Sequence, residues 1–238
     1  MTAHTVVSRE EWLTVRKALL AKEKEFNRLR DQLSAERRAL PWVKLDKDYV
    51  FDGATGPVTL ADLFDGRSQL VIYHLMFHPD WQAACKSCSY WVDSLPAELE
   101  HLHQRDVTVA AISRAPLGKI EAYKKRQGWT LPWVSSYGNS FNHDFGVSFT
   151  KAEVEAGTVA YNYATGGYKN EELPGISVFF KDSDGAIYHT YSTYARGLDM
   201  LNATYHYLDI TPKGRDEDAL KFSMEWVRIR DEYPKRAG

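Results

Sequence analysis

The two cysteines of this chain are the residues whose type and spacing can do chemistry. Cys85 and Cys88 stand three residues apart, between an apolar run over 69–77 and a segment with helical periodicity. Two thiols between a buried strand and a helix can exchange a disulfide with a partner. The same spacing is also half of a zinc site, and buried cysteines can be small hydrophobic residues. The pattern favours redox chemistry, with metal binding and inert packing as alternatives.

The redox interpretation gives the two thiols different roles. Cys85, at the start of the helix, is the attacking thiol, because the helix dipole and unpaired backbone amides favour a thiolate. Cys88 lies one turn further on the same face, where it can resolve a mixed disulfide. Lys86 adds a positive charge between them. This chemistry needs no cofactor, and its partner is a disulfide-bearing protein or a small thiol.

Two further residues are candidates for binding that partner. Trp81 can form an apolar wall beside the dithiol, and Arg114, at the end of the next strand, can bias the thiolate electrostatically. Each also has a structural interpretation, since tryptophan commonly packs in a core and an arginine after a strand commonly forms a surface ion pair.

Composition excludes several classes of partner. The 238 residues include 30 basic and 32 acidic side chains, which gives no basic surface for nucleic acid. No segment approaches about 18 unbroken apolar residues, and the first residues lack the pattern of a secretory signal. A cytoplasmic location is expected. A reducing compartment disfavours a structural disulfide and favours a transient redox or metal role.

The first 41 residues predict a helical extension. Ser8 and Glu11 form a capping box, the helix runs to about Arg38, and Pro41 ends the segment. Its apolar residues follow a three-four spacing that is broken by Lys22; they are Trp12, Val15, Leu19, Phe26, Leu29 and Leu33. Such a stripe must be covered, either by its own domain or as the seam of a homodimer.

Residues 42–238 predict alternating strands and helices. Strands are expected over 47–51, 69–77, 107–113 and 133–136, and a Thr59-capped helical turn over 59–66. Helices are expected over 89–103, with a kink at Pro96, and over 117–128. A hairpin over 175–191 and helices over 198–208 and 216–230 follow an irregular insertion, 137–173, with at most short helices. Parallel strands bring their carboxyl ends to one edge of the sheet, which is where Cys85 follows its strand.

This order of elements resembles the thioredoxin fold. A strand, a dithiol, a helix, a strand and a helix are followed by a proline directly before an antiparallel hairpin. In thioredoxin-like proteins the equivalent proline has a cis peptide bond facing the dithiol, and it presents backbone groups to an incoming partner strand. The resemblance assigns this role to Pro174.

Several longer motifs resemble one bacterial family more closely. They are 41–43 (PWV), 73–77 (YHLMF), 113–116 (SRAP), 141–146 (FNHDFG) and 188–197 (YHTYSTYARG). Together they resemble the thioredoxin-like family catalogued as domain of unknown function number 899, from the first helix to Arg215. Its members are described as predicted dithiol-disulfide oxidoreductases. The resemblance implies an α/β fold of peroxiredoxin type, with a central mixed sheet flanked by helices, in one unit with the N-terminal helix.

Two other functions use the same cysteines. In a thiol peroxidase of peroxiredoxin type, Cys85 would attack peroxide and Arg196 or Arg114 would stabilise it. Peroxiredoxins, however, have threonine or serine three residues before that cysteine, where this chain has Gln82, although Pro79 fits the pattern.

A non-catalytic protein is the remaining alternative. Metal handling would recruit His78 or His189 beside Cys85 and Cys88, because two cysteines alone do not complete a site. A scaffold that only binds partners would leave Cys85 buried and unreactive.

Overall fold

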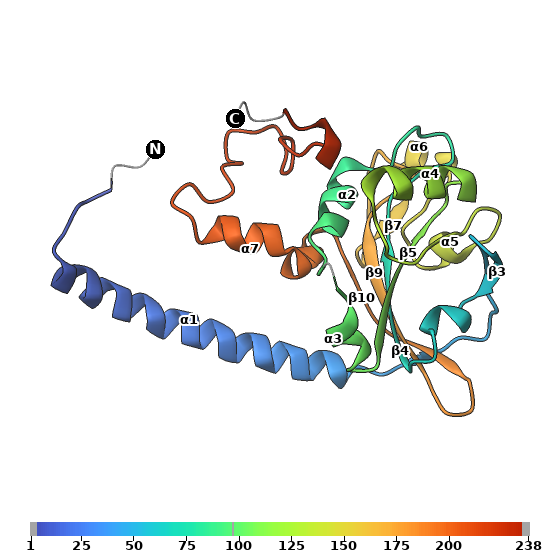
Figure 1. Ribbon diagram of the computed structural model, residues 1–238, viewed down its shortest axis with the longest axis horizontal. Coiled ribbons are helices and arrows are strands. Elements are labelled where there is room, and N and C mark those ends of the chain that lie inside the picture. Colours follow the sequence, from blue (N-terminus) through green and yellow to red (C-terminus); the bar gives the residue numbers. More distant parts are fainter. Residues whose placement is uncertain (1–3, 97, 235–238) are drawn as a thin grey trace. The chain divides into compact units, whose positions relative to one another are not determined.

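The computed structural model describes residues 4–96 and 98–234 (Figure 1). The chain divides into two compact units, one up to Pro41 and one from Trp42 onward.

The first unit is a single helix, α1, Arg9–Arg38. Its start confirms the predicted capping box: the Glu11 amide donates to Ser8 Oγ at 3.2 Å, and the Ser8 amide donates to the Glu11 carboxylate at 2.9 Å. No residue of the helix is buried. In the described part of the chain no helix, α1 included, is both long enough and apolar enough to cross a membrane.

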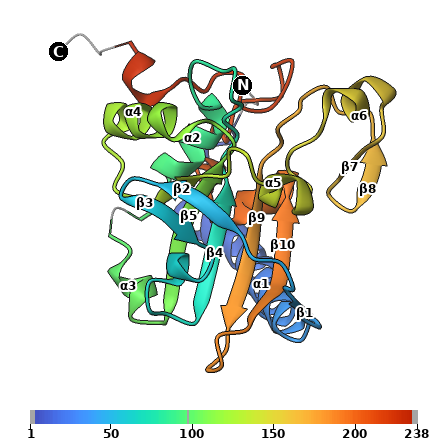
Figure 2. The ribbon, with the colours of Figure 1, turned by 90° about the vertical axis from the view of Figure 1, so that its right-hand side faces the viewer.

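The second unit is built on an eight-stranded mixed sheet (Figure 2). Its spatial order is β1-β10-β9-β4-β5-β6-β2-β3. The strands are β1 Val43–Lys44, β2 Val50–Gly53, β3 Gly56–Thr59, β4 Gln69–His74, β5 Val107–Ser113, β6 Trp133–Ser135, β9 Gly175–Lys181 and β10 Ile187–Tyr194. Strands β4, β5 and β6 are parallel, whereas β9 is antiparallel to β4 and to β10. The order β5-β4-β9-β10, with a helix after β4 and another after β5, is the thioredoxin fold that the sequence predicts.

Alternating side chains of the central strands fill two cores. On one face, Tyr73 of β4 and Val109 of β5 pack with helices α2, Lys86–Asp93, and α4, Leu117–Gln127. On the other face, Ile72 and Ile112 pack against Phe64 of the short helix η1, Asp62–Phe64, and against α5, Phe141–Asp144. This two-residue alternation fixes which side chains of β4 face the dithiol helix.

The predicted helix over 89–103 is wrong in its extent. Helix α2 begins three residues earlier, at Lys86, and ends at Asp93; a separate turn, α3, spans Glu100–His103. Proline lacks the amide that a continuous helix needs, so the chain breaks before Pro96 instead of bending there.

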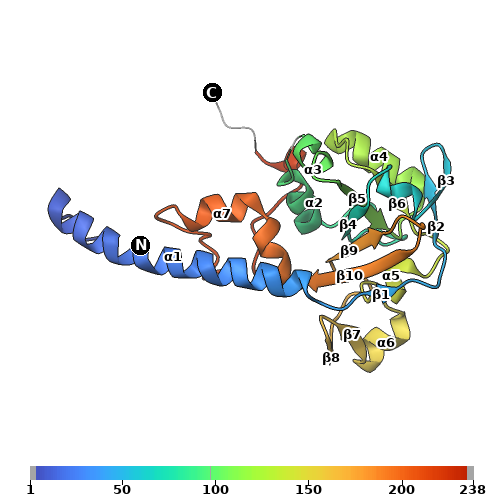
Figure 3. The ribbon, with the colours of Figure 1, turned by 90° about the horizontal axis from the view of Figure 1, so that it is seen from below.

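The insertion contains more structure than predicted. Besides α5 and α6, Lys151–Ala156, it forms a two-stranded sheet from β7, Val159–Tyr161, and β8, Ala164–Gly166. Figure 3 shows α6, β7 and β8 lying together as one small subassembly. The hairpin turn has positive φ at Asn162 and Tyr163, 53° and 62°. Tyrosine rarely adopts positive φ, and the turn contains no glycine. The sequence therefore gives no sign that a hairpin turn lies here.

The C-terminal region contains one of its two predicted helices. Residues 198–208 are helical as η2, Ala195–Leu201, and α7, Ala203–Asp209, which is capped by the side chain of Asn202. The predicted helix over 216–230 is wrong, since this segment forms turns that end in η3, Arg230–Glu232. A side chain replaces the helical hydrogen bonds there: Glu217 Oε1 accepts from the Met224 amide at 3.0 Å and from Trp226 Nε1 at 2.6 Å.

Gly175, the first residue of β9, has no room for a side chain. A Cβ atom added there would lie 2.7 Å from Tyr194 Cδ1 and 3.0 Å from Val147 Cγ1. We expect Gly175→Ala to lower the free energy of unfolding in urea by about 1–3 kcal/mol through overpacking. Gly118→Ala is the matched control, because its Cβ meets open space within α4. A Gly175→Ala protein as stable as the wild type would contradict this close packing.

Candidate active site

The dithiol lies at the N-terminus of α2, after the carboxyl end of β4. Cys85 is the N-cap residue of α2 and is partly exposed, whereas Cys88 is buried, with 2% of its surface exposed. The Cys85 amide donates to the Met76 carbonyl at 3.0 Å, which fastens the start of the helix to the end of the strand segment. Both cysteines are free thiols.

The two thiols have opposite pKa shifts. A hydrogen bond from the Cys88 side chain is the largest influence on Cys85, and backbone and side-chain hydrogen bonds from Ser87 and the Cys88 amide add to it. Together they outweigh burial and lower the pKa of Cys85 to about 6. Burial, followed by the adjacent Cys85, raises the pKa of Cys88 well above its usual range. At neutral pH the site therefore holds one thiolate and one thiol.

Tyr73 is a member of the site that sequence reasoning missed. Its hydroxyl, carried by β4, hydrogen-bonds to Cys88, and burial raises its pKa well above the usual range. Its ring stacks on Trp91 of α2, with centroids 4.0 Å apart. In the sequence, a tyrosine within an apolar strand is interpreted as a core residue. The feature that could have identified Tyr73 as a site residue is its position on the face of β4 that packs against the dithiol helix.

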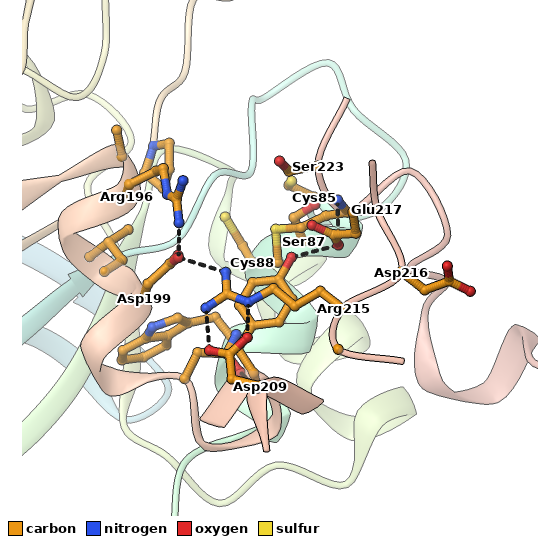
Figure 4. A pocket seen from close by; sticks show the side chains of 18 of the residues that line it. Cys85, Ser87, Cys88, Arg196, Asp199, Asp209, Arg215, Asp216, Glu217 and Ser223 are labelled. Atoms are coloured by element: carbon orange, nitrogen blue, oxygen red, sulfur yellow. Dashed lines mark hydrogen bonds and ion pairs between the residues drawn. The ribbon is translucent and has the colours of Figure 1, made fainter. Parts of the chain in front are cut away.

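Both thiols line a cavity of about 850 Å³ (Figure 4). Pro174 and Tyr73 contribute to its wall, but most of its lining comes from residues 195–224, a segment that we call the hood. Among the charged hood residues at the cavity are Arg196, Asp199, Asp209, Lys213, Arg215, Asp216, Glu217 and Asp218. Apart from Arg196, none of these residues is predicted from the sequence as a site residue, because the order of elements does not reveal that the C-terminal segment returns to the dithiol.

Pro174 lines the cavity together with both cysteines. The described residues contain no cis peptide bond, so the bond before Pro174 is trans, unlike the cis bond of the equivalent proline in thioredoxin-like proteins. Its carbonyl accepts a hydrogen bond from the Tyr161 hydroxyl at 2.6 Å, and the preceding Leu173 amide donates to the Val147 carbonyl at 2.9 Å. Two of the backbone groups beside the dithiol, the Leu173 amide and the Pro174 carbonyl, are therefore bonded within the chain itself.

Trp81 does not line the cavity of the dithiol. It lines a separate cavity of about 350 Å³, together with His78, Lys169 and Glu171. Its side chain is partly buried against the core that also contains Cys88.

Arg114 is engaged by other groups. Its Nε donates to Glu172 Oε1 at 2.6 Å, and its Nη1 donates to His143 Nε2 at 3.1 Å. Glu172, 1% exposed, also accepts from Ser148 Oγ at 2.6 Å, and burial raises the pKa of its carboxyl group. Arg114 is absent from the lining of the dithiol cavity. Its clearest role in the structure is to neutralise a buried carboxylate.

The histidines considered as metal ligands have other neighbours. His78 Nε2 lies 3.5 Å from the Glu171 carboxylate, and His189 Nε2 lies 2.7 Å from Ser192 Oγ. Within residues 4–96 and 98–234, no group of three histidine, cysteine or acidic side chains is arranged to hold a metal ion. Lys86, expected beside the thiols, donates to the Glu225 carbonyl at 2.9 Å.

The sheet order and the dithiol at the start of α2 define a thioredoxin-like protein. Within this class, the chain belongs to the family described as bacterial protein of unknown function (DUF899), whose model matches residues 1–233.

Solved structures similar to this chain include the peroxidoxin BcpB of Mycobacterium tuberculosis, at 14% identity and a TM-score of 0.46, covering 69% of this chain and 95% of that one. A mutant PrxQ of Xylella fastidiosa has 16% identity and a TM-score of 0.43, covering 70% and 95%. A protein described as the thiol:disulfide interchange protein DsbE, from Chlorobium tepidum, has 13% identity and a TM-score of 0.39, covering 68% and 93%. The search of curated proteins finds no match.

Proposed function

We propose that this protein is a thiol-disulfide oxidoreductase in which Cys85 is the nucleophile and Cys88 the resolving thiol. The observation that carries the proposal is the hydrogen-bonded pair of thiols with opposite pKa shifts at the start of α2. A stabilised thiolate beside a buried thiol is the arrangement that thiol-disulfide exchange uses.

The exchange proceeds in two steps. The Cys85 thiolate attacks one sulfur of a disulfide, a mixed disulfide forms at Cys85, and the other half leaves as a thiolate. The Cys88 thiol passes its proton to a departing sulfur and attacks Cys85, which releases the second half and closes the Cys85–Cys88 disulfide. The protein loses two electrons and the substrate disulfide gains them.

The peroxidase alternative has less support from the site. Arg114 is paired with Glu172, and Arg196, whose side chain is 87% exposed, extends to Asp199 at 3.4 Å. Gln82, at the position where peroxiredoxins have threonine or serine, is exposed. Neither guanidinium is thus held in the way that a peroxide-activating group requires.

A redox titration tests the proposal. The protein is equilibrated with mixtures of reduced and oxidised dithiothreitol and quenched with N-ethylmaleimide in denaturant, so that the buried Cys88 is also alkylated, and its intact mass is measured. We expect two species that interconvert reversibly, one with both cysteines alkylated and one with neither. Cys88→Ser is the matched control, since it cannot form the internal disulfide. Wild-type protein that keeps both cysteines alkylatable at every ratio would overturn the proposal.

A further inference from the structure

The hood, residues 195–224, is a fixed wall around the dithiol cavity. Arg215 holds it together, because its guanidinium bonds Asp199 at 2.8 Å and Asp209 at 2.7 Å and lies 3.8 Å from the centroid of the Tyr205 ring. Glu217 accepts from the Tyr205 hydroxyl at 2.8 Å. Charge pairs and a cation–π contact therefore tie the helical first half of the hood, η2 and α7, to the turns that follow Asp209.

The hood is also fastened to α2, the helix that carries the dithiol. Ser94 Oγ lies 3.2 Å from Asn202 Oδ1, and the rings of Tyr90 and Tyr205 are 5.6 Å apart, edge to face. Cys85 thus opens into a cavity whose wall is largely made by the hood.

Two of the backbone groups beside Pro174 are already bonded within the chain. The Pro174 carbonyl is bonded to Tyr161, the Leu173 amide is bonded to Val147, and proline has no amide of its own. Addition of a strand depends on unpaired main-chain groups at the binding edge. The structure therefore disfavours an extended polypeptide as the disulfide substrate.

Charges of both signs stand unpaired at the cavity. Within the described residues, Lys213, Asp216 and Asp218 line it without an ion-pair partner, and all three are exposed to solvent. Arg196 makes one long contact with Asp199. A ligand that carries both carboxylate and ammonium groups can satisfy these side chains, and the cavity volume of about 850 Å³ suits a small molecule.

We infer that the substrate is a low-molecular-weight disulfide bearing carboxylate and ammonium groups, of the amino-acid or short-peptide class. This inference rests on the proposed function and names its substrate. Cys85 and one substrate sulfur form the mixed disulfide, Cys88 then closes the protein disulfide, and two small thiols leave carrying the two electrons.

Single-turnover kinetics with the reduced protein test this inference. The probes are glutathione disulfide, the uncharged bis(2-hydroxyethyl) disulfide, and insulin as a protein disulfide. Each rate is divided by that of free dithiothreitol with the same probe, which removes differences in intrinsic reactivity. We expect the normalised rate to be about tenfold higher for glutathione disulfide than for the uncharged disulfide, and lowest for insulin.

The outcomes separate the two proposals. Reaction with none of the probes would overturn the proposed function. Insulin reacting as fast as glutathione disulfide, after normalisation, would overturn the small-molecule inference and leave the proposed function standing. Lys213→Glu should slow glutathione disulfide severalfold more than the uncharged disulfide. Equal slowing of both would contradict charge recognition at the cavity.

A separate observation on α1 supports a second inference, about an interaction surface. The residues Trp12, Val15, Leu19, Lys22, Phe26, Leu29 and Leu33 occupy consecutive a and d positions of a heptad repeat, with a at Trp12. Val15 is 70% exposed and Phe26 is 63% exposed. Seven consecutive a and d positions of this kind are the pattern of a two-stranded coiled-coil interface, here with one charged residue, Lys22, among them.

The flanking charges select the partner and its direction. In a parallel pair of identical helices, each g position faces the e position five residues later on its partner. These pairs are Glu11 with Arg16, Ala18 with Glu23, Glu25 with Arg30, and Gln32 with Arg37. None joins like charges, and two join opposite ones. We propose that α1 pairs with α1 of a second copy as a parallel coiled coil.

Light scattering on the full chain over a concentration series tests this pairing. We expect a dimer, a dissociated protein for Glu25→Arg, and a restored dimer for Glu25→Arg combined with Arg30→Glu. Residues 25 and 30 lie five apart and are not neighbours within one helix, so restoration requires a second chain. A wild-type monomer up to millimolar concentration, or a double variant that stays dissociated, would overturn the proposal.

Discussion

Replacing Cys85 with serine is expected to lower the rate of disulfide cleavage at pH 6 by at least about tenfold. At this pH about half of Cys85 is thiolate, whereas a thiol with a pKa above 9 has fewer than about one thiolate in a thousand. The lower pKa makes the Cys85 thiolate intrinsically less nucleophilic by roughly twentyfold, which offsets part of this advantage. Burial of Cys88 adds to the difference, since the resolving thiol is hardly accessible to a substrate.

The companion variant Cys88→Ser separates the two roles. The nucleophile is present but the resolving thiol is not, so glutathione disulfide should leave one glutathione attached to Cys85. Intact mass and peptide mapping after single turnover measure this adduct. If the adduct formed instead on Cys88 in the Cys85→Ser protein, at a rate close to that of the wild type, the assignment of roles would be reversed.

Replacing Arg114 with methionine is expected to lower the free energy of unfolding by about 3 kcal/mol at pH 7. Removing one partner of a buried ion pair leaves an uncompensated charge, here on Glu172, whose side chain is 2% exposed. Urea denaturation measures the loss. The double variant Arg114→Met with Glu172→Gln should regain much of it, because no buried charge is then left unpaired.

The pH dependence of this loss has a defined sign. The pKa of Glu172 is already raised in the folded protein, and removal of the neighbouring guanidinium raises it further. A carboxyl group whose pKa is raised by folding destabilises the fold as pH rises above its unfolded value. The variant should therefore lose less stability near pH 4 than at pH 7. Equal losses at the two pH values would show that Arg114 contributes through packing and not through the Glu172 charge.

The same variant tests whether Arg114 biases the thiolate. Because Arg114 bonds Glu172 and His143, we expect the alkylation midpoint of Cys85 to be unchanged by Arg114→Met. A clear upward shift of that midpoint would restore the role that the sequence suggested.

The sequence could predict the central elements of the fold because their signals are local. Strand β5 follows from a mostly apolar run, and helix α4 from its periodicity and its end at Gly128. The dithiol follows from two cysteines at helical spacing. The family resemblance is confirmed over residues 1–233.

The rest of the site depends on contacts that are distant in sequence. Tyr205 and Arg215 are site residues because the chain returns to α2 after β10. The hood is held together by side-chain bonds, which leave no periodic pattern in the sequence. The predicted helix over 216–230 was wrong for the same reason: the Glu217 carboxylate organises turns where propensity favoured a helix. Pro174 lines the dithiol cavity, but its bond with Tyr161 depends on an insertion whose hairpin has no turn signal in the sequence.

The most direct test of this account is the pH dependence of Cys85 alkylation by iodoacetamide. In the reduced wild-type protein, the rate at Cys85, resolved by peptide mass, should rise with pH to a plateau with a midpoint near pH 6. Cys88→Ala should move the midpoint upward, because it removes the largest stabilising hydrogen bond, while Cys88→Ser, which keeps a donor, should move it less. A wild-type midpoint at or above about pH 8.5, the value of an ordinary cysteine, would contradict the stabilised thiolate and the function built on it.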